Sequence, residues 1–120
     1  MKKFIPASLL CCGLFFSQCK KEELVKAYYT VAENSADAPS YSITYTSDKS
    51  GASTIAGSSE ENWNSGSLLM EHGQFISLTV ECTEPVYDFT LKIFTGGNLA
   101  AIEHFSNPAR TKTISVKIED

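Results

Sequence analysis

Hydrophobic and polar residues alternate with a period of two along most of the chain after residue 24. The alternation is regular in five stretches, at residues 25–31, 41–45, 76–82, 87–93 and 114–118. Neighbouring side chains of an extended strand point to opposite faces, so each stretch is predicted to be a strand with one buried face. Weaker strand signals at 52–56, 68–70 and 99–105 bring the expected number of strands to seven or eight.

Turn signals separate these stretches. Asp48-Lys49-Ser50-Gly51 predicts a type I turn with Gly51 in the left-handed conformation, and Gly96-Gly97 predicts a two-residue hairpin turn. No stretch has the period of an amphipathic helix. Short strands with turns at intervals of roughly 8–12 residues predict an all-β fold, an antiparallel β-sandwich.

An apolar row is expected on the otherwise polar outer face. If 75–82 pairs with 87–94 and both keep their apolar faces inward, Phe75 lies opposite Phe94 on the outside. The tight hairpin turn that follows then adds Leu99 to the same row. Two interpretations stay open: the row stabilises the sheet or packs under a loop, or it is a patch that binds a protein or a sugar.

The first residues have a different pattern. Lys2 and Lys3 precede an apolar run of about a dozen residues, at positions 4–16, which is too short to span a bilayer and is typical of a secretory signal peptide. The alternative is a buried N-terminal helix of a cytosolic domain. Nothing downstream is patterned like a helical partner for it, so we expect a signal peptide over residues 1–18.

The apolar run ends in Phe16-Ser17-Gln18-Cys19, which resembles a bacterial lipobox. Phe16 stands where that motif prefers Leu, and Gln18 where it prefers Gly or Ala; this relaxed form is similar to the lipoproteins of the Bacteroidota phylum. The resemblance implies cleavage before Cys19 and attachment of diacylglycerol to its sulfur. The acyl chains would then hold the protein at a membrane.

Lys21, Glu22 and Glu23 follow the cysteine and resemble the lipoprotein export signal of the same phylum. The resemblance implies a protein anchored in the outer membrane and facing the cell exterior, with the periplasmic face as the alternative. The expected organisation is a signal peptide at 1–18, a lipidated cysteine with a charged tether at 19–26, and one β-sandwich domain at 27–120.

A second resemblance covers nearly all of that domain. It rests on Tyr29-Thr30-Val31, Ser42-Ile43-Thr44-Tyr45-Thr46, Trp63, Gly73-Gln74-Phe75 and Leu91-Lys92-Ile93-Phe94-Thr95-Gly96-Gly97. This layout is similar to the small immunoglobulin-like β-sandwich of the mycobacterial small membrane-protein (MmpS) family and of uncharacterised Bacteroidota lipoproteins. The resemblance implies an immunoglobulin-like sandwich. The mycobacterial proteins are helix-anchored accessory partners of lipid-exporting transporters, so an accessory role at a lipid transporter is a weaker alternative here.

Charge and cysteine content narrow the class of protein. The net charge of −4 becomes more negative once Lys2 and Lys3 are removed, which argues against nucleic-acid partners and against adhesion to anionic lipid by charge. Beyond the signal peptide and Cys19 only Cys82 remains, so no intramolecular disulfide is possible. The domain must therefore be held together by its core.

Candidate chemistry is sparse. The chain has no Gly-x-Ser-x-Gly, no phosphate loop and no paired Cys or His metal motif. Glu71-His72 and Glu103-His104 are adjacent residues, which a strand points to opposite faces, so neither pair is expected to hold a metal. Cys82 lies in an apolar row without a base or cation spaced to activate it, which favours a structural thiol. We expect no cofactor, no metal and no enzymatic activity.

The favoured function is a lipid-anchored, non-enzymatic envelope lipoprotein that displays its sandwich to bind a protein or to serve as an accessory subunit of an outer-membrane assembly. A carbohydrate-binding or adhesin-like module is the main alternative. The single Trp63 is expected to plug the core under the end of the sandwich rather than to form a ligand platform.

Overall fold

The computed structural model describes residues 24–35 and 39–119, and all regular structure in them is β. The strands are β3 (Val25–Glu33), β4 (Tyr41–Thr46), β5 (Ser53–Ser58), β6 (Asn62–Asn64), β7 (Leu68–Met70), β8 (Phe75–Glu81), β9 (Asp88–Thr95), β10 (Asn98–Ser106) and β11 (Thr111–Lys117). The sandwich thus begins at Val25, slightly before the predicted boundary at residue 27.

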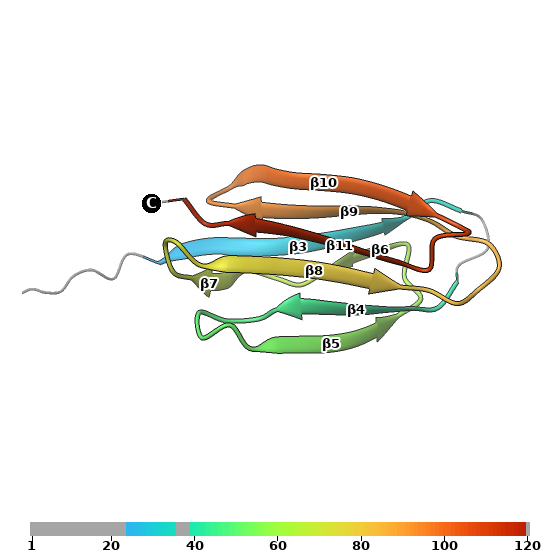
Figure 1. Cartoon of the computed structure of the whole chain (residues 1–120), viewed down its shortest axis with the longest axis horizontal. Helices are drawn as coiled ribbons and strands as arrows, with labels where there is room; N and C mark the ends of the chain where they lie inside the picture. Colours follow the sequence, from blue (N-terminus) through green and yellow to red (C-terminus); the bar gives the residue numbers. More distant parts are fainter. Residues whose placement is uncertain (1–23, 36–38, 120) are drawn as a thin grey trace, which may run out of the picture.

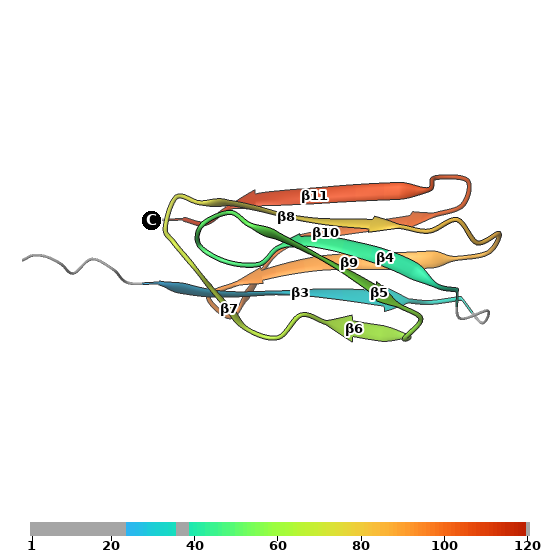
Figure 2. The same ribbon diagram turned by 90° about the horizontal axis from the view of Figure 1, so that it is seen from below.

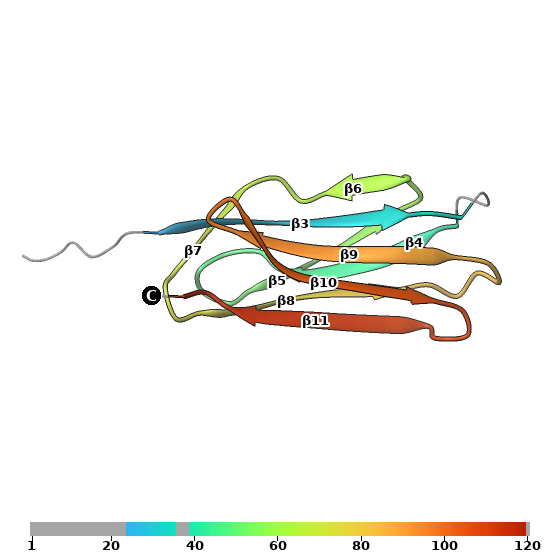
Figure 3. The same ribbon diagram turned by 90° about the horizontal axis from the view of Figure 1, so that it is seen from above.

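Two antiparallel sheets pack face to face, which confirms the predicted β-sandwich (Figure 1). The first sheet has the order β10-β9-β3-β6, with β7 also paired to β3. The second sheet has the order β11-β8-β4-β5. Figure 2 views the molecule from the side of the second sheet, and Figure 3 from the side of the first.

The core forms where the apolar faces of the long strands meet. Its fully buried side chains follow the predicted alternation and are Tyr29, Val31, Ile43, Met70, Ile76, Leu78, Val80, Tyr87, Phe89, Leu91, Ile93 and Ile118. Burial of this apolar surface is the main favourable term in folding, and each strand therefore turns that face inward. The prediction of which face of each long strand is buried is confirmed.

The expected pairing of 75–82 with 87–94 is wrong. β8 pairs with β11 and β4 in the second sheet, whereas β9 pairs with β10 and β3 in the first. The loop between β8 and β9 thus carries the chain from one layer to the other. A period of two shows which face of a strand is buried, and both layers of a sandwich bury a face in the same way, so the pattern leaves strand neighbours open.

The two predicted turns are formed as expected. Gly51 has a φ of 88°, and Gly96 and Gly97 have φ values of 58° and 85°, in the left-handed region that glycine adopts without strain. The hairpin between β9 and β10 pairs Thr95 with Asn98 and Phe94 with Leu99. The polar segment 59–67, which shows no regular alternation, contains the additional short strand β6.

Strand direction gives the sandwich two distinct ends (Figure 1). The N-terminal end holds the start of β3, the end of β11, the β9–β10 hairpin and the turn at 71–74. The far end holds the loops that follow β5, β8 and β10. The first described residues therefore lie at the N-terminal end.

Tyr29 links the two sheets through a buried hydrogen bond. Its ring lies in the core, and its hydroxyl donates to the backbone carbonyl of Thr46 on β4 at 2.6 Å. Burial raises the pKa of Tyr29 above its ordinary value, so the hydroxyl stays protonated as a donor over the physiological range. The hydroxyl thus satisfies a carbonyl that would otherwise be buried between the layers.

Replacing Tyr29 by Phe is expected to lower the free energy of unfolding by about 1–2 kcal/mol, because the Thr46 carbonyl loses its partner from the other sheet. Equilibrium denaturation in urea measures the loss. Tyr28→Phe is the matched control, since the neighbouring ring lies on the outer face of the same strand, and it should change stability little. Equal losses for both variants would contradict a specific role for the buried hydroxyl.

Candidate functional site

The outer face of the first sheet carries an apolar row across three strands. Tyr28 on β3 is the register partner of Phe94 on β9, and Phe94 is the register partner of Leu99 on β10. The Tyr28 and Phe94 rings stack with their centroids 4.5 Å apart and 10° between their planes. Leu99 remains 50% exposed beside them, so the row faces solvent.

Phe75 does not belong to this row, contrary to the prediction. It opens β8 in the second sheet, where it is 71% exposed, and the Lys117 ammonium lies 5.9 Å from its ring centroid. Tyr28 occupies the place that was expected for Phe75. The sequence did put Tyr28 on the outer face of its strand; the missing information was that β3, and not β8, is the neighbour of β9.

Ile102 extends the apolar row along β10. The register shifts between Leu99 and Ala101, and this bulge brings Ile102 opposite Lys92 on the outer face. Ile102 is 50% exposed. Sequence reasoning missed it because alternation is weak in this strand. We call Tyr28, Phe94, Leu99 and Ile102 the outer-face patch.

A shallow groove of about 350 Å³ lies beside the patch on the same face. Its lining residues are Tyr28, Thr30, Val31, Ala32, Asn62, Trp63, Asn64, Lys92 and Phe94. Thr30 and Ala32 have short side chains, which leaves the groove hollow above β3. Asn62 and Lys92, on the neighbouring strands, supply an amide and an ammonium. No carboxylate is among the lining residues, although the chain as a whole is acidic.

The stacked rings stand upright on the sheet. Neighbouring strands are separated by about 4.8 Å, close to the distance between the two centroids, so the ring planes face each other across the strands. Their edges therefore point outward, and their faces are largely used against each other. A flat platform of coplanar rings, on which a sugar could stack, is not formed by this pair.

Trp63 takes part in both the core and the groove. It is half-buried, packs against the core cluster and lies 5.3 Å from the Tyr45 ring, centroid to centroid. The expectation that it fills the core is confirmed. Trp63 is also among the residues that line the groove, a position that composition did not indicate.

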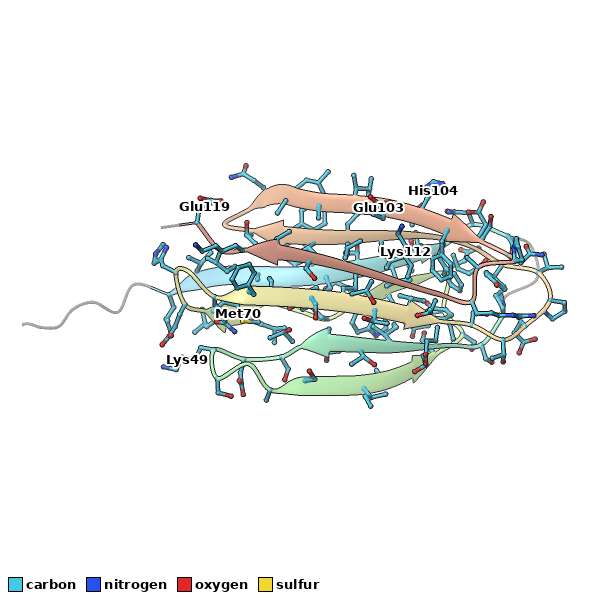
Figure 4. The ribbon with its side chains drawn as sticks, in the orientation of Figure 1. Lys49, Met70, Glu103, His104, Lys112 and Glu119 are labelled. Atoms are coloured by element: carbon cyan, nitrogen blue, oxygen red, sulfur yellow. The ribbon has the colours of Figure 1, made fainter. Side chains whose placement is uncertain are left out.

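The two Glu-His pairs do not assemble a site. On β10, Glu103 forms an ion pair with Lys112 at 3.4 Å across the seam between the sheets, while His104 projects from the outer face (Figure 4). His72 lies in a turn rather than a strand, and its Nδ1 is 2.6 Å from the carbonyl oxygen of Glu119, which accepts the hydrogen bond. Within residues 24–35 and 39–119, no three His, Cys, Asp or Glu side chains are grouped to hold a metal ion.

Cys82 is buried, as predicted. Its thiol donates to the backbone carbonyl of Ser40 at 3.4 Å, and burial raises the pKa of Cys82. A raised pKa keeps the sulfur protonated at neutral pH, whereas a nucleophilic cysteine requires the thiolate. The position is therefore that of a structural thiol in the core.

Glu33 is a buried acidic residue that sequence reasoning did not single out. One carboxylate oxygen accepts hydrogen bonds from the backbone amides of Ser35 and Asp88, each at 3.1 Å, and from the Ser35 hydroxyl at 2.7 Å. These bonds tie the end of β3 to the start of β9. The residue thus has a structural role at the far end of the sandwich.

Cys19, Lys21, Glu22 and Glu23, the predicted lipidation and export residues, lie outside the described residues. In the part of the chain that is described, no helix has the length and apolar character needed to cross a membrane. Neither a protein-family model nor a curated protein matches the chain.

Proposed function

We propose that this chain is a lipid-anchored, non-enzymatic lipoprotein of the bacterial outer membrane that binds an envelope protein through its outer-face patch. The leader and Cys19 support the anchor, and Lys21-Glu22-Glu23 supports display at the cell exterior. β3 begins at one end of the sandwich, so an anchor attached there would leave the faces of both sheets open to partners.

The observation that carries the binding function is the outer-face patch itself. Leu99 and Ile102 are each 50% exposed next to the stacked Tyr28 and Phe94 rings, with polar side chains around them. Exposed apolar side chains gathered on one face and rimmed by polar groups are characteristic of protein-binding surfaces. Lys92 beside Ile102 adds a cation without an ion-pair partner among the described residues, which favours a partner with acidic groups near its contact surface.

Aspartate in place of both Leu99 and Ile102 is expected to abolish partner binding while leaving the fold intact, because both side chains are half exposed in the free protein. Chemical cross-linking in intact cell envelopes, followed by mass spectrometry, measures the loss of cross-linked partner. Thermal unfolding of the same variant checks the fold.

The matched control is Ile55→Asp, which places the same charge at a 73% exposed isoleucine of the second sheet and should leave cross-linking unchanged. Unchanged partners in the Leu99 and Ile102 variant, or a large fall in its melting temperature, would show that the patch serves packing.

A carbohydrate ligand is the second candidate, and the groove favours it. Asn62, Thr30 and Lys92 offer amide, hydroxyl and ammonium groups along one side of the Tyr28 ring, and such groups orient sugar hydroxyls or a sugar carboxylate. The upright rings would contact a sugar by their edges rather than by a stacking platform. This geometry is why protein binding ranks first.

If the groove holds a glycan, the purified chain should bind a defined subset of an array of bacterial and host glycans, and Asn62→Ala should weaken that binding about tenfold. Asn98→Ala, an exposed amide outside the groove, is the control and should bind as the unchanged chain does. An array without any signal removes this candidate.

The proposed anchor is tested by measuring whether the protein is found in the membrane fraction or in the soluble fraction. Cys19→Ala is expected to move the protein from the membrane fraction to the soluble fraction and to abolish the mass increment of the acyl chains, because two or three buried chains are needed for stable residence. Cys82→Ala, at the buried thiol, should stay with the membrane. A Cys19→Ala protein that remains tightly membrane-bound would overturn the proposed anchor.

A further inference from the structure

Exposed apolar side chains collect at the N-terminal end of the sandwich. Phe75 begins β8 and is 71% exposed, and Leu69 on β7 is 51% exposed opposite Lys26. They lie on the two outer faces of the same end, since β7 belongs to the first sheet and β8 to the second. Neither residue is part of the outer-face patch, so protein binding through that patch leaves both uncovered.

The charges of the two ends differ. Near the far end the exposed ionisable residues are mainly acidic: Glu60, Glu61, Glu81 and Glu84, with Arg110 as the nearby cation. Near the N-terminal end the exposed charges are mixed: Lys26, Lys49, Lys117, Asp48, Glu71 and Glu119; Lys49 and Glu119 are marked there in Figure 4. An acidic end is repelled by the anionic groups of a membrane, and a mixed end is not.

Chain length keeps the N-terminal end close to the bilayer. This step rests on the proposed acylation of Cys19. Five residues lie between Cys19 and Val25, the first residue of β3, and the six backbone steps from Cys19 to Val25 span at most ~20 Å when fully extended. The end that carries Phe75 and Leu69 therefore stays within ~20 Å of the membrane.

We propose that the N-terminal end of the sandwich rests on the lipid bilayer, with Phe75 and Leu69 inserted at the level of the headgroups. The contact is apolar rather than electrostatic, in agreement with the acidic character of the chain. Lys117, whose ammonium lies 5.9 Å from the Phe75 ring centroid, reaches lipid phosphates while its stem stays along the ring. The bilayer thus covers the apolar side chains of Phe75 and Leu69, which a protein bound at the outer-face patch would leave exposed.

Site-directed spin labelling of the acylated full chain tests this orientation. Nitroxides are placed on Phe75→Cys or Leu69→Cys in a chain that also carries Cys82→Ala, and the protein is reconstituted in phosphatidylethanolamine and phosphatidylcholine vesicles. In the vesicle-bound protein the nitroxide should collide more often with oxygen and less often with a water-soluble nickel complex. The reference is the same label in the detergent-free soluble form that carries Cys19→Ala. The matched control is Val86→Cys, a 47% exposed apolar position in the loop at the far end, which should report water in both forms.

The outcomes separate the inference from the proposed anchor. Protein that sediments with the vesicles but has an aqueous label at position 75 overturns the bilayer contact and leaves the anchor standing. Protein that stays in solution and lacks acyl mass overturns the anchor, and the contact that rests on it. A membrane-like signal at position 86 as well as 75 overturns the orientation.

A second measurement needs no acyl chain. The chain carrying Cys19→Ala should bind the same vesicles weakly, and Phe75→Asp should reduce its partition coefficient about tenfold or more, because one aromatic side chain is lost from the interface. Val86→Asp should leave the coefficient unchanged. Circular dichroism verifies that Phe75→Asp folds, and equal partitioning of the two variants would overturn the role of Phe75.

Discussion

The rest of the structure depends on the burial of two apolar sheet faces against each other. Among the described residues Cys82 is the only cysteine, and it is a buried free thiol, so no covalent bond joins the layers. Cohesion comes from interdigitated side chains and from tyrosine hydroxyls that reach backbone carbonyls. Tyr29 bonds Thr46, Tyr41 bonds Glu60 and Tyr87 bonds Ala109. Each ring fills core volume while its hydroxyl satisfies a backbone acceptor, so these residues supply both packing and specificity.

The sequence predicted which residues are buried far better than it predicted which strands lie next to each other. Val31, Leu78 and Leu91 fell on inward faces because each strand alternates cleanly, and alternation is set by the strand itself. The neighbour of each strand is decided by contacts far apart in the chain, which no local pattern encodes. Phe94 and Leu99 were placed together correctly because a two-residue glycine turn fixes their register. Phe75 was misplaced because a longer loop allowed β8 and β9 to enter different sheets.

The candidate site shows the same difference: the part set by local turn chemistry could be predicted, and the part set by strand pairing could not. The half of the outer-face patch that lies on the β9–β10 hairpin could be derived from turn chemistry, apart from the bulge that exposes Ile102. The half that contains Tyr28 could not be derived from the sequence, because it requires β3 to be the neighbour of β9 in the sheet. Asn62 and Asn64 flank Trp63 in a segment rich in serine and glycine, where three residues are too few to show a period. Their position in the groove therefore required the three-dimensional arrangement.

The two proposed surfaces constrain the partner when they are considered together. Leu99 belongs to the outer-face patch but lies next to the hairpin at the N-terminal end. This is the end that, in our proposal, the short tether keeps near the bilayer. If the anchor is as proposed, a partner that covers this patch must approach close to the bilayer, which favours a protein that is itself seated in or on the membrane. A freely diffusing partner would meet the acidic far end first, and that end shows no comparable apolar patch among its described residues. The geometry thus favours a subunit of a membrane assembly over a receptor for soluble ligands.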